Sequence, residues 1–144
     1  MAFAKKKREL PLRVEDVMTT PAVTIKMDAS VEEAAKIMDE KRISSILVVD
    51  NNGKLVGIFT DRDLRFAAAN GKIGKGIPIH MLMTENPITI APNEPITEAL
   101  RKMRDADVKH LPVVDKENKP VGVIAVRDVL DAVMMLMQLM TGQA

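Results

Sequence analysis

The chain repeats itself at a fixed offset of 65 residues, and this duplication limits its fold more than any other feature. Residues 17–65 align with residues 82–130 without a gap, and 15 of the 49 aligned positions are identical. Unrelated chains of average composition would share roughly three identities over that length. Because a fixed period marks a repeated structural unit, we expect two copies of one fold.

Each copy is predicted to follow the order strand, helix, strand, strand, helix. In the first copy the expected elements are a strand at 23–25, a helix from Ser30, strands at 46–49 and 55–59, and a helix at about 61–70. Ser30 and Glu33 have the spacing of a capping box, and Asn52-Gly53 is a strong hairpin signal. In the second copy the matching elements are a helix containing Ile96 to Met103, strands at 111–114 and 121–126, and a helix from Arg127.

The predicted fold class is therefore α+β, with two β-α-β-β-α repeats. One copy of about 60 residues would bury only a marginal core, so the two should pack against each other. The stretch between the copies is predicted to be a linker because it contains Gly71, Gly74 and Gly76. The expected organisation is a mobile arm at 1–12, a first repeat at 13–71, a linker at 72–78 and a second repeat at 79–141.

Composition excludes several kinds of function. The chain has no cysteine, so disulfides, thiolate zinc sites and a cysteine nucleophile are absent. A net charge of +1 and the lack of Trp and Tyr give no reason to expect a nucleic-acid partner. No apolar run is long enough to span a bilayer, and no secretory signal is present. His80 and His110 lack zinc-motif spacing, and no catalytic set is visible, so we expect a cytoplasmic protein that is neither an enzyme nor a metal protein.

These features resemble the CBS domain family, named after cystathionine beta-synthase, over roughly residues 13–140. The most specific match is residues 57–64, Gly-Ile-Phe-Thr-Asp-Arg-Asp-Leu, which follow the family's ribose-binding pattern of Gly, two apolar residues, Ser or Thr, two variable residues and Asp. The second copy keeps the Asp but has Ala125 in place of the hydroxyl residue. The resemblance implies a pair of repeats with pseudo-twofold symmetry and two clefts that bind AMP, ADP, ATP or S-adenosylmethionine.

The resemblance also implies which residues would bind the ligand. Thr60 and Asp63 would hold the ribose, because an ionised carboxylate can accept from both ribose hydroxyls. The same Thr-x-x-Asp pattern is also that of an ordinary helix N-cap, and both roles can hold together. Asp128 would be the ribose residue of the second cleft. The adenine slots would be Thr20, Ala22, Val23, Ile43 and Ser45 in the first cleft, and Asn86, Ile88, Val108 and His110 in the second.

Phosphates need cations, and the family places them just before the strand that follows the first helix of a repeat. Here Lys109 and His110 hold that position and are expected to face the ligand of the Asp63 cleft, with Arg62 and Arg127 as further candidates. The amides at the start of the helix add partial positive charge. For each slot or cationic residue taken alone, core packing or a solvated surface is the competing interpretation.

The last predicted helix is apolar nearly all round between residues 129 and 140. We expect it to be buried against its own module and against a second subunit, which predicts a homodimer. Residues 5–8 are basic and either belong to the mobile arm or dock onto an acidic partner or nucleic acid. The expected function is a stand-alone nucleotide sensor, without a catalytic cofactor, that signals to a separate protein. The alternative is a dimerisation scaffold whose cleft is empty.

Overall fold

The computed structural model describes residues 12–142, so the predicted arm lies outside the described residues except for Leu12. The first repeat contains β1 (Thr24–Lys26), α2 (Val31–Lys41), β2 (Ser45–Val49), β3 (Leu55–Thr60) and α3 (Asp61–Ala69), preceded by α1 (Val14–Val17). The second contains β4 (Thr84–Glu85), α4 (Ile96–Ala106), β5 (His110–Val114), β6 (Pro120–Ala125) and α5 (Val126–Thr141), preceded by the 3-10 helix η1 (Ile79–Met81). The two-repeat α+β fold is confirmed.

The details of several elements differ from the sequence prediction. The residues of the second repeat that match β1 form only a parallel bridge between Ile90 and Val113. Strand β6 ends at Ala125, and α5 begins one residue early, because the Ala125 amide donates to the Asp128 carboxylate at 2.8 Å. The Ser30 hydroxyl accepts from the Glu33 amide at 3.1 Å, but the return bond of the predicted capping box is not formed.

Each helix that was predicted from apolar spacing buries that face. Helix α2 buries Val31, Ala34 and Met38 in a core with β2 and β3. The matching residues of α4, which are Ile96, Ala99 and Met103, are buried in a second core with β5 and β6. Spacings of three and four residues place such side chains on one helix face, and burial of that face stabilises each repeat.

The two repeats exchange their leading segments. Val14 of α1 is fully buried in the core of the second repeat. Ile79 of η1 is fully buried in the core of the first repeat. Strand β4 then pairs antiparallel with β3 and completes a four-stranded sheet in the order β1-β2-β3-β4. Thr19 makes the corresponding contact with β6, through two backbone hydrogen bonds to Val123 of 2.8 and 3.0 Å.

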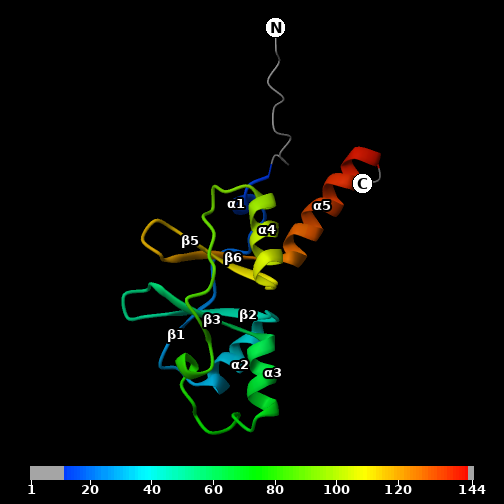
Figure 1. Cartoon of the computed structure of the whole chain (residues 1–144). Helices are drawn as coiled ribbons and strands as arrows, with labels where there is room; N and C mark the ends of the chain where they lie inside the picture. The colour runs from blue at the N-terminus through cyan, green and yellow to red at the C-terminus, as the bar shows by residue number, and fades with distance from the viewer. Residues whose placement is uncertain (1–11, 143–144) are drawn as a thin grey trace.

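The hairpins β2–β3 and β5–β6 lie next to each other at the middle of the molecule, and the helices lie beyond them (Figure 1). Leu47, Leu55 and Ile58 form a small core here with partly buried residues of the second repeat. Asn118, at the turn of the second hairpin, accepts from the Leu55 amide at 3.0 Å and donates from Nδ2 to the Leu55 carbonyl at 3.1 Å. The repeats therefore share apolar and polar contacts.

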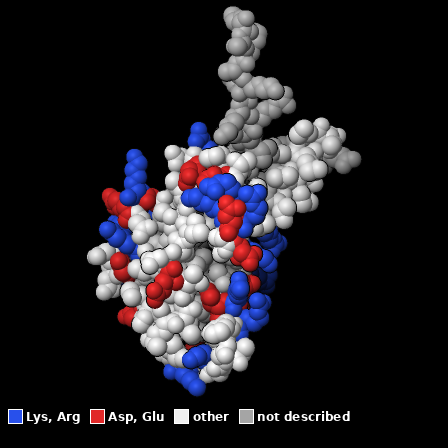
Figure 2. Space-filling view, viewed as in Figure 1, with Lys and Arg blue, Asp and Glu red and all other residues white. Residues whose placement is uncertain are grey.

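Helix α5 extends away from this body (Figure 1). Its first turns pack through Val129, which is buried, and Val133 on the core of the second repeat. On the side seen in Figure 2, the part of α5 that projects from the body carries no charged side chain. Within residues 12–142, no helix combines the length and the apolar character that crossing a membrane requires.

Candidate functional site

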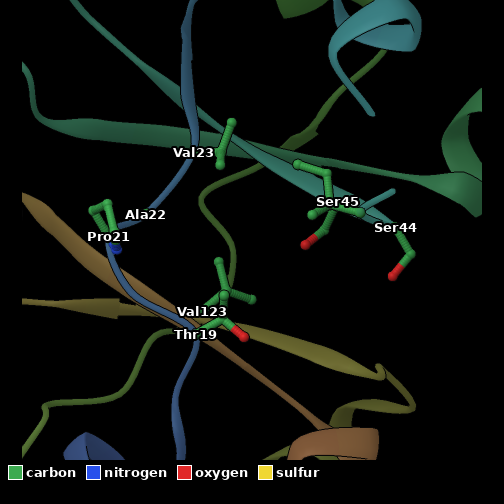
Figure 3. A pocket seen from close by; sticks show the side chains of 8 residues that line it. Thr19, Pro21, Ala22, Val23, Ser44, Ser45 and Val123 are labelled. Carbon is green, nitrogen blue, oxygen red and sulfur yellow. The ribbon is translucent and has the colours of Figure 1, made fainter. Parts of the chain in front are cut away.

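A pocket lies where the leading segment of the first repeat meets β2 and β6. It is lined by Thr19, Pro21, Ala22, Val23, Ile43, Ser44, Ser45 and Val123. Figure 3 shows Val23 and Ser45 on one side and Thr19 and Val123 on the other. The empty space, including the part open to solvent, is about 450 Å³. Five of the eight lining residues are apolar, and the lining comes from both repeats.

Four of the five residues predicted for the first adenine slot line this pocket, namely Ala22, Val23, Ile43 and Ser45. Thr20 does not, because its hydroxyl donates to the Val121 carbonyl at 3.0 Å. Sequence reasoning missed Val123, which belongs to the other repeat and reaches the pocket through its pairing with Thr19. Exchange of leading segments leaves no local signal in the sequence.

Thr60 and Asp63 lie beside the pocket and do not form its wall. Thr60 pairs with Ser45 across the β2–β3 ladder, so both side chains stand on one face of the sheet. Asp63 Oδ2 accepts from the Thr60 amide at 3.0 Å and from its hydroxyl at 3.3 Å. Oδ1 accepts no hydrogen bond within residues 12–142. The carboxylate therefore caps α3 through Oδ2 and leaves Oδ1 without a hydrogen-bond partner among the described residues.

The first amides of α3 already have acceptors within the chain. The Asp61 amide donates to the Ser44 carbonyl at 2.9 Å, and the Arg62 amide donates to Asp61 Oδ1 at 3.0 Å. The Asp63 amide donates to the Thr60 hydroxyl at 3.4 Å. An anion at this end of the helix would meet amide protons that are already bonded, so its main partners would have to be side chains.

His110 reaches the first pocket from the second repeat. Its Nε2 lies 2.8 Å from the hydroxyl of Ser44, which lines the pocket. Burial lowers the pKa of His110, an effect that the charges of Asp61 and Asp128 oppose and that of Lys109 reinforces. Lys109, Arg62 and Arg127 are exposed.

The residues predicted for the second cleft are placed differently. Ile88 is 47% exposed and Val108 is 39% exposed, whereas their counterparts Val23 and Ile43 are partly buried. Asn86 is exposed, and its amide donates to the Val56 carbonyl at 3.2 Å. The Asp128 carboxylate caps α5, but Ala125 has no hydroxyl to accept from the Asp128 amide. The two predicted sets of site residues are therefore not equivalent.

Comparison with known sequences identifies one family. The family described as CBS domain matches residues 14–70 and 79–135. A CBS domain-containing protein of Dictyostelium discoideum is 33% identical over an alignment of 135 residues that covers 87% of this chain and 93% of the relative. The homoserine O-acetyltransferase of Methanohalobium evestigatum is 36% identical over 116 residues, 81% of this chain but only 23% of the enzyme. The chain thus spans about a quarter of that enzyme's length.

Two solved structures have closely similar folds. The CBS domain pair of protein MJ0100, in complex with 5′-methylthioadenosine and S-adenosyl-L-methionine, is 34% identical, with a TM-score of 0.79 over 84% of this chain and 94% of the other. The CBS domain protein PAE2072 from Pyrobaculum aerophilum, complexed with AMP, is 25% identical, with a TM-score of 0.79 over 90% of this chain and 99% of the other.

Proposed function

The chain belongs to the CBS domain family, and we propose that it binds an adenosine-containing compound in the pocket between its repeats and reports the binding to another protein. The observation that carries the proposal is the position of Thr60 and Asp63 beside a mostly apolar pocket that both repeats line. Proteins of the same fold have been solved with AMP, 5′-methylthioadenosine and S-adenosyl-L-methionine. These compounds share only the adenosine part.

The pocket residues fit the two halves of an adenosine. Val23, Ile43 and Val123 offer apolar surface for a flat base, and backbone groups at the pocket edge can bond its rim. The free Oδ1 of Asp63 can accept from a ribose hydroxyl, while Oδ2 continues to cap α3. The hydroxyls of Ser44 and Ser45 lie close enough to contribute further hydrogen bonds.

Binding would act on the relation between the repeats. Because residues of both repeats line the pocket, a bound ligand favours the arrangement in which both walls contact it. We further propose that the protein is a homodimer whose subunits meet through the exposed apolar side of α5. A change between repeats would then alter how two copies of α5 sit together, and a partner protein could recognise that change.

Thermal unfolding with excess AMP, ADP, ATP, S-adenosylmethionine or 5′-methylthioadenosine tests the proposal. A ligand at about 100 times its dissociation constant stabilises the folded state by roughly 2.7 kcal/mol. For a chain of this size the melting temperature should then rise by about 5–10 °C. If none of the five compounds raises the melting temperature, the sensor function is rejected.

The variant Asp63→Ala separates ligand binding from helix capping. It should weaken binding at least tenfold and also cost about 1 kcal/mol of stability through the lost cap. Ser30→Ala is the matched control, because Ser30 caps α2 with a 3.1 Å bond and does not line the pocket. It should cost similar stability and leave affinity unchanged. Equal affinity for the ligand in Asp63→Ala and the parent protein would show that Asp63 caps α3 and does not bind the ligand.

One observation favours the alternative of a dimerisation scaffold. Asp63 already has a structural role in α3, so its presence does not require a ligand. A scaffold would form the same dimer and bind its partner equally well with and without adenosine compounds. Measured turnover of ATP by the purified protein would instead point to an enzyme. The likeness to the acetyltransferase does not support an enzyme, because it covers only 23% of that protein.

A further inference from the structure

The contact between Ser44 and His110 joins the two repeats at the edge of the pocket. Ser44 lies just before β2, and His110 is the first residue of β5, the equivalent strand of the other repeat. The Oγ to Nε2 distance is 2.8 Å. A serine hydroxyl can donate or accept, so this contact suits both the neutral and the protonated imidazole. His110 therefore stays beside the pocket in either state.

The charged groups that face His110 nearly balance. Asp61 approaches from α3, Asp128 from α5, and Lys109 from the preceding position of its own chain segment. With a neutral imidazole these three groups sum to −1, and with a protonated imidazole the cluster sums to zero. Protonation of His110 therefore adds one positive charge to this side of the pocket, which favours an anion there.

The binding of a phosphate at this edge of the pocket would depend strongly on the charge of His110. The Asp61, Arg62 and Asp63 amides of α3 already donate to acceptors within the chain. They cannot offer free protons to a phosphate, as the start of a helix often does. An uncharged thioether or a sulfonium group at the 5′ carbon of the ribose does not need a positively charged partner.

Resting on the function proposed above, we propose that His110 selects the ligand by the charge of its 5′ substituent. Protonated His110 favours a 5′-phosphate, and neutral His110 favours an uncharged or sulfonium group. His110 is then a specificity-determining residue that makes the preferred adenosine compound depend on pH.

The direction of the pH dependence follows from the two states of the pocket. Without a ligand, burial lowers the pKa of His110 below its ordinary value of 6.5, so the neutral ring predominates at pH 7. A bound phosphate raises that pKa, so AMP binding takes up a proton. The added affinity is fully present below the lower pKa of the free protein. It disappears as pH rises through the higher pKa of the complex.

Isothermal titration with AMP and 5′-methylthioadenosine between pH 5.5 and 8 tests the proposal. The phosphate of AMP itself loses charge near pH 6, so the variant His110→Gln serves as the reference. Lowering the pH should raise the affinity ratio of AMP to 5′-methylthioadenosine about three- to tenfold more in the parent protein than in His110→Gln. The control variant His80→Gln, at the chain's other histidine, should behave like the parent protein.

The outcomes separate the two proposals. If the ratio changes equally with pH in the parent protein and in His110→Gln, His110 does not select the ligand, although the pocket still binds adenosine. If neither compound binds at any pH, the proposed function itself fails. NMR titration of the two histidines of the parent protein requires no variant. A pKa of His110 that AMP leaves unchanged would also overturn the selection.

Discussion

Gly57 and Gly122 stand where the leading segment of one repeat crosses the last strand of the other. A Cβ atom at Gly57 would lie 2.4 Å from the Met83 sulfur and 2.9 Å from the Thr84 carbonyl oxygen. At Gly122 it would lie 2.7 Å from the Thr19 carbonyl oxygen and 2.8 Å from the Met18 sulfur. These glycines therefore permit the close crossing of two backbones, which is a different role from ligand binding.

Replacing either glycine by alanine should destabilise the protein by about 1–3 kcal/mol, because the added methyl overpacks the crossing. Thermal unfolding should show a larger loss for Gly122→Ala, whose nearest neighbour is a backbone atom, than for Gly57→Ala, whose nearest neighbour is a flexible side chain. Adding Met83→Ala should recover part of the Gly57→Ala loss and none of the Gly122→Ala loss. An unchanged melting temperature for Gly122→Ala would contradict this account.

The residues of the Gly-x-x-Thr-x-x-Asp pattern were predictable individually, but their surroundings were not. The spacing of Thr60 and Asp63 predicts a cap, and the structure contains both of its bonds. Thr20 is held out of the pocket wall by its hydrogen bond to Val121. Ser44, at the pocket edge, contacts His110 of the other repeat. Contacts over such sequence distances depend on how the repeats pack, which no local pattern encodes.

At the scale of elements, α5 has two apolar stripes, and the described part of the chain covers only one of them. Val129 and Val133, four residues apart, face the core of the second repeat. Leu130, Met134 and Met137 follow the same helical spacing on another face and are 57%, 58% and 60% exposed. A surface helix needs a single apolar stripe, so the second one favours contact with another copy.

If the proposed dimer forms through α5, the double variant Met134→Glu with Met137→Glu should convert it into a monomer, because two buried carboxylates at the subunit contact would remain unpaired. Light scattering coupled to gel filtration measures the change, and circular dichroism should stay the same since both side chains are exposed within one subunit. Met81→Glu is the matched control, with 66% exposure and a position outside α5. A dimer that survives the double change would place the subunit contact elsewhere.

Elements differed in how far the sequence could predict them. Apolar spacing located α2 and α4, since a helix depends on residues three and four apart. Strand β4 has only two residues and is defined by its pairing with β3. No run of apolar residues in the sequence predicts it. No local pattern indicates that the strand expected before α4 is reduced to a single bridge between Ile90 and Val113.

In the whole molecule, neither hydrophobic core consists of the residues of one sequence repeat alone. A single offset defines the repeats, yet each repeat needs residues from the other copy to complete its core. Val14 completes the second core, and Ile79 completes the first. Partly buried Leu82 and Met83 add to the first core, as Val17 and Met18 add to the second. The exchange ties the folding of each half to the presence of the other.

Cutting the chain between residues 74 and 75 should therefore yield two halves that fold poorly alone. A fragment of residues 1–74 retains α2, β2, β3 and α3 but lacks Ile79 and strand β4. A fragment of residues 75–144 lacks Val14 and the pairing of Thr19 with β6. Each should give a weak or absent thermal transition by circular dichroism. An equimolar mixture should regain a cooperative transition, because each half carries the segment that the other needs.

The fragment of residues 20–85 distinguishes exchange from small size as the cause. It is shorter than residues 1–74, yet it contains Ile79, Leu82, Met83 and β4, and so the whole first core. If small size were the cause, the shorter fragment would be the less stable of the two. If the exchanged segment is required, residues 20–85 should melt cooperatively while residues 1–74 do not. A fragment 1–74 that is as stable as 20–85 would show that the exchange is dispensable for folding.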